Sequence, residues 1–485
     1  MNAALLGVAG YFVLGVLGFI VPKPRLTSAL ALTAGTISFA CWLPGFPTGY
    51  LGIGDWAIPW LGDPLAATFW GLALFLHFVI LLGQDHPRQF YPLLTLLIGT
   101  TLSAVLSQDL FNLYVALELS SLIAFLLVGM EGKPAQVWAS LKYLILTSCG
   151  MTLYLLGVGF VYGELGTLSL VEIAGLGMGL GDRGLTLGVG LLLAGAAAKG
   201  GVFLYALWLP LAHGYAPAPV SALLSGVVVK MGIVALARIS AAFPVSEVLV
   251  GLGLVTGLLG AIHALWEPRL KVFLAYSTTS QLGYLLLGFG FGAWRGALAY
   301  AVAHGLVKGL LFLAAGRAEK EGTSHLISRL PGKLSGETRA LLALGTLAIV
   351  GFPPLAGYPA KGLLAAGAPP WGKWALTALT LATAAYFAKL LPLLLGGGPW
   401  PRPRYLPGWL LGAAVVGTGL WGLIALPEMR APPQVLFGMG LPLMGFLVQR
   451  VLARLPLRLP RWRLDEAFTA LLVAGTGLAL WLLLR

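Results

Sequence analysis

This chain of 485 residues is poor in charged side chains and in cysteine, and each shortage argues against a class of protein. Only 10% of its residues are Asp, Glu, Lys or Arg, whereas a soluble globular chain carries about 25%. The two cysteines, Cys41 and Cys149, lie in apolar segments, which argues against a disulfide framework or a metal cluster. No phosphate-binding loop or nucleophilic triad stands out, so we expect no cofactor and no metal in this chain.

Apolar residues are what the chain has in excess. Hydrophobic residues make up 58% of it, and the mean hydropathy is +0.90. Runs of the roughly 20 apolar residues that cross a bilayer recur from end to end, so we predict an all-α polytopic membrane protein with about sixteen transmembrane helices. The predicted helices cover residues 3–21, 26–43, 64–83, 90–107, 109–130, 135–162, 186–210, 217–243, 246–265, 270–291, 294–316, 338–367, 371–396, 408–426, 433–449 and 465–484.

The net charge of +13 lies mostly at the ends of the apolar runs, which argues against a nucleic-acid partner. Most cations fall in the odd-numbered loops: Lys23, Arg25, Arg88, Lys133, Arg269, Lys271, Arg317, Lys320, Arg329, Lys333, Arg339, Arg402, Arg404, Arg450, Arg454, Arg458, Arg461 and Arg463. The even-numbered loops hold only Arg183, Arg238, Arg295, Lys373 and Arg430. The positive-inside rule therefore predicts cytoplasmic odd loops, with both termini on the non-cytoplasmic side of the cell membrane.

Ionisable residues inside the predicted spans point to function, because an ammonium near the bilayer centre costs about 2.5 kcal/mol or more. They are Lys142, Lys199, Lys230, Lys308, Lys361 and Lys389, with Glu118 as the one acid in a similar position. One acid cannot keep six buried lysines charged, and a lysine poised between its two forms can accept and release a proton. For each lysine the alternative is snorkelling or a structural hydrogen bond, most of all for Lys142 and Lys389.

Two predicted helices, the seventh and the twelfth, are interrupted by helix-breaking residues. Pro210 lies at the end of the seventh, and Gly351–Pro354 splits the twelfth. Carbonyls freed in this way are tolerated at membrane depth only where they line a polar cavity. Lys199 precedes the first break and Lys361 follows the second.

The two breaks are five helices apart, as are Lys230 in the eighth helix and Lys389 in the thirteenth. An odd offset reverses direction across the membrane, so we predict two inverted five-helix repeats. The predicted organisation is then N-terminal helices over 1–89, a first half-channel over 90–243, a second over 244–396 and C-terminal helices over 397–485.

Histidines accompany the lysines. His304 and Lys308 are four residues apart and hence on one helix face, where an imidazole can relay protons between lysines. The alternative is a buried histidine with satisfied hydrogen bonds. His263, near a helix end, is more typical of a structural or mouth residue, and we place it with Lys142 and Lys389 on a secondary proton path. Asp109 is predicted to cap the fifth helix.

Around these residues the sequence resembles a known family. The segments that carry the resemblance are NLYVALELSSL, SLKYLILTS, AKGGVFLYALWLP, PVSALLSGVVVK, LKVFLAYSTTSQLGY, AHGLVKGLLFLAAG and GFPPLAGYPAKGLL. In this order, over roughly residues 60–400, they resemble the antiporter-like subunits of Mrp cation/proton antiporters and of respiratory complex I. NLYV and PVSALLSGVVVK are most similar to the Mrp D subunit.

The resemblance implies a core of fourteen helices, here followed by a C-terminal pair. It implies that Glu118 modulates Lys199, that Lys361 is the terminal proton site, and that the half-channels are linked by Lys230, His304 and Lys308. Lys142 matches the lysine of the family's sixth helix. The implied partners are other membrane subunits of a hetero-oligomeric complex, with protons and Na⁺ as the transported ions.

Some positions depart from the family. Leu211 stands where an acid often follows the WLP turn, and Trp266-Glu267 replaces a common Gln-Asp. These departures put the subfamily and its partners in question. Two alternatives stand beside a Na⁺/H⁺ antiporter subunit: a proton-pumping subunit of a complex I-like NADH:quinone oxidoreductase or membrane-bound hydrogenase, and a membrane scaffold without transport. Any redox chemistry would belong to a partner, and only then would the chain be part of a translocase enzyme.

Overall fold

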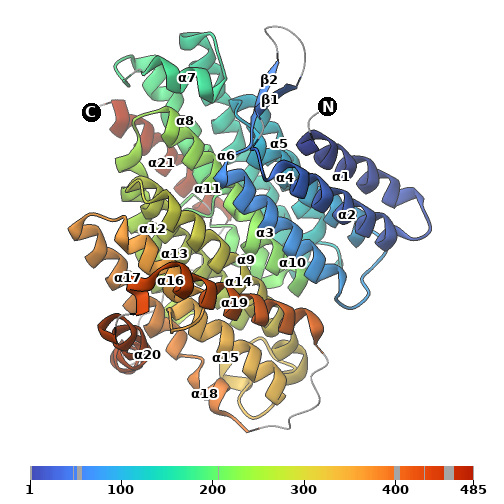
Figure 1. Ribbon diagram of the computed structural model, residues 1–485, viewed down its shortest axis with the longest axis vertical. Helices are drawn as coiled ribbons and strands as arrows, with labels where there is room; N and C mark the ends of the chain where they lie inside the picture. The colour runs from blue at the N-terminus through green and yellow to red at the C-terminus, as the bar shows by residue number, and fades with distance from the viewer. Residues whose placement is uncertain are drawn as a thin grey trace. The chain divides into compact units, whose positions relative to one another are not determined.

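A computed structural model describes residues 3–46, 48–51, 57–177, 179–205, 207–397, 405–430, 432–452 and 464–483. Most of them are helical (Figure 1), and eight of the described helices are long and apolar enough to cross a membrane. The predicted all-helical membrane fold is confirmed at this level, whereas the count of sixteen spans and the inverted repeats stay predictions. The predicted loop cations Arg402, Arg404, Arg454, Arg458, Arg461 and Arg463 lie outside the described residues.

Every predicted run coincides with one helix or with consecutive helical pieces. The uninterrupted helices are α1 (Ala3–Ile20), α2 (Pro24–Trp42), α3 (Pro64–Leu81), α4 (Phe90–Leu106), α5 (Leu110–Val128), α6 (Pro134–Leu165), α12 (Ser246–Trp266), α13 (Leu270–Gly290), α14 (Trp294–Gly322), α19 (Leu406–Ala425), α20 (Pro432–Leu452) and α21 (Leu464–Leu483). The interrupted runs are α8 (Arg183–Lys199) with α9 (Leu209–Tyr215), α10 (Ala218–Leu223) with a π-helical turn (Leu224–Val228) and α11 (Val229–Ala242), α15 (Gly336–Val350) with α16 (Gly357–Ala366), and α17 (Pro370–Ala388) with α18 (Leu391–Leu395).

The helix ends follow local capping chemistry. The Asp109 carboxylate accepts a hydrogen bond from the amide of Asn112 at 2.7 Å, so its predicted role as the cap of α5 is confirmed. Asp63 caps α3 in the same way, through the amide of Ala66. The short elements that were not predicted are α7 (Leu170–Leu176), the 3-10 helical turns Ile327–Arg329 and Pro427–Arg430, and the antiparallel hairpin of β1 (Thr48–Leu51) and β2 (Ile58–Leu61).

The chain forms two compact units. The first comprises Met1–Trp208, Val227–Val245 and Trp462–Arg485, and the second comprises Leu209–Gly226 and Ser246–Arg461. Within the first unit α8 packs against α6, α11 and α21. Within the second, α12 packs along α13, and α14 contacts α10, α13, α15, α16 and α19.

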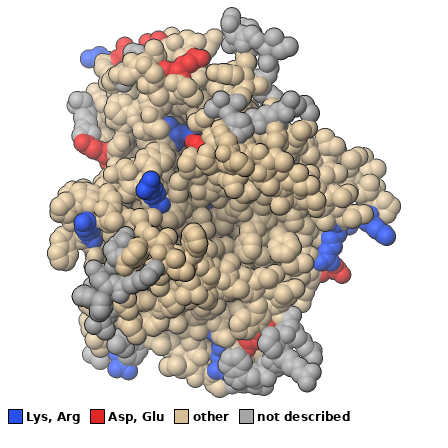
Figure 2. Space-filling model, in the orientation of Figure 1, with Lys and Arg blue, Asp and Glu red and all other residues tan. Residues whose placement is uncertain are grey.

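The surface of the chain fits a lipid environment. On the face drawn in Figure 2, charged side chains are few and scattered among uncharged residues. Large hydrophobic side chains stand exposed on several helices, among them Trp374 and Trp421. Because bilayer lipid is as apolar as these side chains, such exposure is expected of a membrane protein and needs no protein partner.

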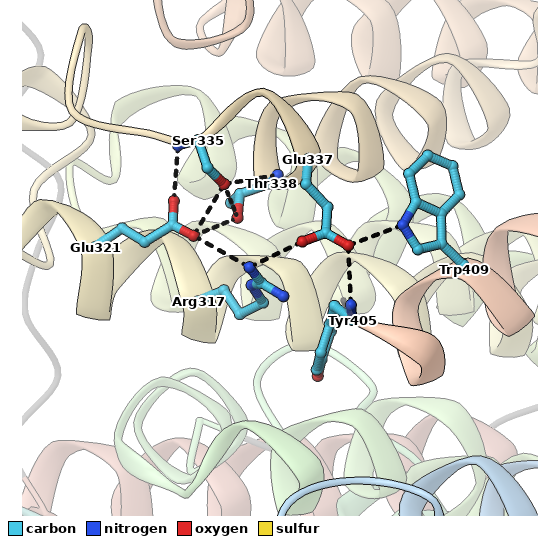
Figure 3. A network of polar contacts seen from close by, with 7 residues as sticks. All are labelled: Arg317, Glu321, Ser335, Glu337, Thr338, Tyr405 and Trp409. Carbon is cyan, nitrogen blue, oxygen red and sulfur yellow. Dashed lines mark hydrogen bonds and ion pairs between the residues drawn. The ribbon is translucent and has the colours of Figure 1, made fainter. Parts of the chain in front are cut away.

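An ionic cluster joins α14, α15 and α19 within the second unit (Figure 3). Arg317 of α14 lies 3.1 Å from Glu337 and 3.4 Å from Glu321. Glu337 also accepts hydrogen bonds from the Tyr405 amide and the Trp409 indole, each at 2.9 Å. Burial raises the pKa of Tyr405 to about 12, so its ring faces the Arg317 guanidinium as a neutral phenol. The cluster therefore stabilises the packing of the beginning of α19 against α14 and α15.

Glycines let α19 approach the broken helix. A Cβ on Gly419 would lie 2.0 Å from the carbonyl oxygen of Pro354, in the segment between α15 and α16. One turn earlier in α19, the carbonyl of Val415 accepts a hydrogen bond of 3.1 Å from the amide of Ala356. The chain between α15 and α16 is thus held by the backbone of α19, which supplies an acceptor that the broken helix lacks.

Candidate functional site

Lys199 is the last residue of α8 and lies at the point where this helix breaks. The sequence placed the break at Pro210, and that position is wrong. The helix ends before Gly200, and Gly201 takes a positive φ of 70° that an L side chain adopts only at a cost. Pro210 instead occupies the first turn of α9, where a missing amide donor is tolerated.

The Lys199 ammonium is held by hydroxyl groups. It donates to Ser121 Oγ of α5 at 2.5 Å and to the Tyr143 hydroxyl of α6 at 3.3 Å, and the side chain is buried. A hydroxyl can accept from an ammonium and can also donate to a neutral amine, so these partners serve both forms of the lysine. The carbonyl of Ala198 accepts a hydrogen bond from the Trp208 indole, which ties the loop after the break back to α8.

Glu118 lies one helical turn before Ser121 on α5. Its Oε1 accepts a hydrogen bond of 2.8 Å from Ser148 of α6, while its Oε2 is buried without a hydrogen-bond partner among the described residues. A buried carboxylate oxygen without a hydrogen-bond donor costs free energy. Such an oxygen can be satisfied by binding a proton or by accepting a hydrogen bond from another donor. Glu118 and Lys199 therefore lie in the same part of the first unit, where α5, α6 and α8 pack together. Glu118 is hydrogen-bonded to Ser148, and Lys199 is hydrogen-bonded to Ser121 and Tyr143.

Lys230 is fully buried and is the second residue of α11, which follows the π-helical turn Leu224–Val228. Such turns occur often at functional sites. Two residues later, Gly232 approaches the break after Lys199 so closely that a Cβ there would lie 2.2 Å from the Gly200 amide nitrogen. Lys142, buried on α6, immediately precedes the Tyr143 that holds Lys199.

In the second unit, Lys361 lies on α16 after the other break. Its ammonium donates to the carbonyls of Ile349 at 2.9 Å and Val350 at 3.4 Å, which are the last two residues of α15. It also lies 4.9 Å from the centre of the Tyr284 ring. Gly351, with φ of 97°, ends α15 where the sequence predicted the break. A lysine thus neutralises the negative end of a half-helix.

His304 and Lys308 lie on α14 as the sequence predicted, and both are fully buried. Lys308 donates to the carbonyl of Leu274 at 2.9 Å and to the hydroxyl of Ser277, both on α13. The ring of His304 lies 6.3 Å from that of Tyr300, one turn earlier on α14. Lys308 therefore faces α13, the helix whose Tyr284 ring lies next to the Lys361 ammonium. His304, four residues earlier, lies on the same face of α14 as Lys308.

Lys389 and His263 have structural partners. The Lys389 ammonium donates to the carbonyls of Ala264, Leu265 and Glu267 at the end of α12, at 2.7–3.2 Å. These are carbonyls that a helix end leaves without an internal partner, which favours a capping role for Lys389. The ring of His263 donates to the carbonyl of Leu259 at 2.9 Å.

Several buried polar groups of residues were missed from the sequence, and two of them involve uncharged partners. In the first unit His77 lies between the Tyr11 hydroxyl at 3.0 Å and the Ser28 hydroxyl at 2.9 Å. In the second unit Gln281 of α13 is the centre of a cluster of tyrosines and threonines. Uncharged hydroxyl and amide side chains are common in apolar helices, so they do not stand out in the sequence as a charged residue does. Among the described residues, no group of three His, Cys, Asp or Glu side chains could hold a metal ion.

The proteins that this chain resembles point to one family. The family described as NADH:quinone oxidoreductase/Mrp antiporter, TM, matches residues 107–386. The N subunit of the NADH-quinone oxidoreductase of Desulforudis audaxviator is 34% identical, over 90% of this chain and 93% of its own length. The D subunit of the Na⁺/H⁺ antiporter of Alkalihalophilus pseudofirmus is 30% identical, over 61% of this chain and 63% of its own.

A solved structure shares the fold. A chain of an archaeal respiratory membrane complex, the membrane-bound sulfane sulfur reductase, superposes with a TM-score of 0.77 at 21% identity. The match covers 93% of this chain and 100% of that one. At this identity the likeness concerns the arrangement of helices alone.

Proposed function

Because this chain belongs to the NADH:quinone oxidoreductase/Mrp antiporter family of multi-pass membrane subunits, we propose that it translocates protons as one subunit of a larger membrane complex. The family resemblance found in the motifs is confirmed. The finer assignment to an Mrp D subunit stays part of the proposal, since relatives of both kinds match.

The observation that carries the proposal is the position of Lys199. It is a buried lysine at the end of a broken helix, held by two hydroxyls, with Glu118 one turn away from one of them. Desolvation favours a neutral amine and a nearby carboxylate favours an ammonium, so small changes around Glu118 shift the proton on Lys199. A structural scaffold would gain nothing from the cost of burying these groups.

In the proposed route, protons exchange at Lys199 under the influence of Glu118, pass Lys230, continue through His304 and Lys308, and reach Lys361. Lys142, Lys389 and His263 belong to a secondary path at most, and the three carbonyls around Lys389 support a capping role instead. The proposed orientation keeps both termini on the non-cytoplasmic side. Na⁺ is the proposed coupling ion in an antiporter setting.

The test is the Lys199→Ala variant, expressed with its partner subunits and reconstituted into liposomes. We expect driven proton movement to fall to background while the subunit still assembles, because alanine can neither hold nor release a proton. Lys133→Ala is the matched control, since Lys133 is an exposed lysine paired with Glu131. Wild-type proton movement in Lys199→Ala would refute the proposal.

A redox-driven complex is the second candidate setting, and the relative from Desulforudis audaxviator favours it because the match spans nearly the whole of both chains. Purification of the complex in mild detergent separates the two settings. Co-purification of iron–sulfur subunits would support a redox-driven complex, and co-purification of further antiporter subunits would support cation/proton exchange.

A further inference from the structure

The Gln281 cluster is a group of six buried polar residues, all in the second unit and none with a charge. It consists of Gln281 and Tyr284 on α13, Tyr300 on α14, and Thr380, Thr383 and Tyr386 on α17. Burying this many polar groups among apolar helices is costly unless each is hydrogen-bonded, so their arrangement calls for an explanation.

The cluster lies between two members of the proposed proton route. On one side, the Tyr300 ring lies 6.3 Å from that of His304. On the other, the Lys361 ammonium lies 4.9 Å from the centre of the Tyr284 ring. The two tyrosine rings are themselves 5.2 Å apart, so the cluster spans the distance from His304 to Lys361.

Gln281 is the centre of the hydrogen bonding. Its carbonyl oxygen accepts from the Tyr300 hydroxyl, and its amide nitrogen donates to Thr383 Oγ1 at 3.0 Å and to the Tyr386 hydroxyl at 2.7 Å. Both amide hydrogens are therefore in use. A carboxamide keeps a fixed donor end and a fixed acceptor end, whereas a hydroxyl can exchange the two roles.

The threonine hydroxyls of the cluster direct their hydrogen bonds to the backbone of α17. The hydroxyls of Thr380 and Thr383 donate to the carbonyls of Leu376 and Leu379, each at 2.8 Å. Tyr284, 3.1 Å from Thr380, must then be the donor of that pair. A chain that carries protons must be able to reverse its hydrogen bonds, and one that ends at a main-chain carbonyl cannot pass a proton onward.

We propose that the Gln281 cluster is a proton barrier between His304 and Lys361, closed by Gln281 and opened only when its hydrogen bonds rearrange. This inference rests on the proposed function, because a barrier matters only on a proton route. The polar side chains allow water or a reoriented hydroxyl to enter the open state, which an apolar plug would prevent. Gln281 is thus a positioning residue that controls proton passage without itself carrying the proton.

The decisive variant is Gln281→Glu. A carboxylate has two acceptor oxygens, so Thr383 and Tyr386 would turn their hydroxyls toward it, and a protonated carboxyl could donate in either direction. We expect passive proton conductance to rise at least about tenfold, which corresponds to a barrier lowered by about 1.4 kcal/mol. The complete complex would be reconstituted into liposomes with a pH-sensitive dye inside, and the leak measured under an imposed potential with no driving reaction.

Two further variants complete the test. Gln281→Leu, apolar and of similar size, should keep the leak at the wild-type level and lose driven transport, because the barrier could no longer open. Gln108→Glu is the control, since Gln108 is a buried glutamine of the first unit outside the cluster, and its leak should stay at the wild-type level.

If Gln281→Glu does not assemble, Tyr300→Phe provides a second test of the barrier. It removes the hydroxyl that donates to the Gln281 side-chain carbonyl. A water must then enter to donate to that acceptor, so the proton leak should rise. A wild-type leak in the assembled Gln281→Glu complex, or in Tyr300→Phe where that complex fails, would overturn the barrier. Because the leak needs no driven transport, the Lys199→Ala experiment can refute the proposed function independently of this result.

Discussion

Replacement of Glu337 by glutamine tests how firmly α19 is fastened to the second unit. Glu337 is almost completely buried, and its two oxygens have different partners: Oε1 accepts from Tyr405 and Trp409, and Oε2 faces Arg317. A glutamine can keep the carbonyl acceptor at Oε1, but its amide group then points hydrogens at the Arg317 guanidinium. The change therefore removes the ion pair and leaves the two hydrogen bonds in place.

The size of the effect follows from burial. Breaking a buried ion pair costs about 3–5 kcal/mol, because the remaining charge is left without its partner. The Arg317 side chain is 26% exposed and retains Glu321 at 3.4 Å, so solvent and the second acid offset part of the loss. We expect a decrease of about 2–3 kcal/mol in the free energy of unfolding.

Unfolding of the purified protein by SDS in mixed micelles, followed by circular dichroism, measures this difference. Glu131→Gln is the matched control, because Glu131 pairs with Lys133 at 2.6 Å where both side chains are solvent-exposed. An exposed pair contributes about 0.2–1 kcal/mol. Equal losses in the two variants would refute the view that the Arg317 cluster fastens α19.

Two more substitutions have clear expectations. Gly419→Ala places a methyl group 2.0 Å from the Pro354 carbonyl and should cost about 1–3 kcal/mol by overpacking, measured in the same unfolding assay. Gly417→Ala, on the same helix with nothing within 4 Å of the new Cβ, should be neutral or stabilising, and a similar loss there would contradict the packing argument. Lys389→Arg should preserve driven transport, because an arginine can still donate to the carbonyls of α12 although it does not release its proton. Loss of transport with normal assembly would instead place Lys389 on the proton path.

The candidate site was partly predictable from the sequence. Lys199, Lys361 and Glu118 could be found because an ionisable residue in an apolar run is rare, whatever the fold around it. The break before Lys361 was located correctly, since Gly351 and the prolines after it interrupt a helix locally. The break after Lys199 was misplaced because a proline is tolerated in the first turn of a helix, and a pair of glycines is a weaker sequence signal.

The sequence by itself determined the helical membrane class, since a bilayer requires long apolar helices whatever their packing. It also indicated which ionisable residues lie within apolar segments, because charge and hydropathy are properties of single segments. Only the tertiary structure decided the partners of these charges. That Lys199 meets two hydroxyls, that Lys389 meets three carbonyls, and that Gln281 joins three helices depends on which faces of distant segments come together. Hydrogen bonds act over about 3 Å, so they are fixed by packing rather than by order along the chain.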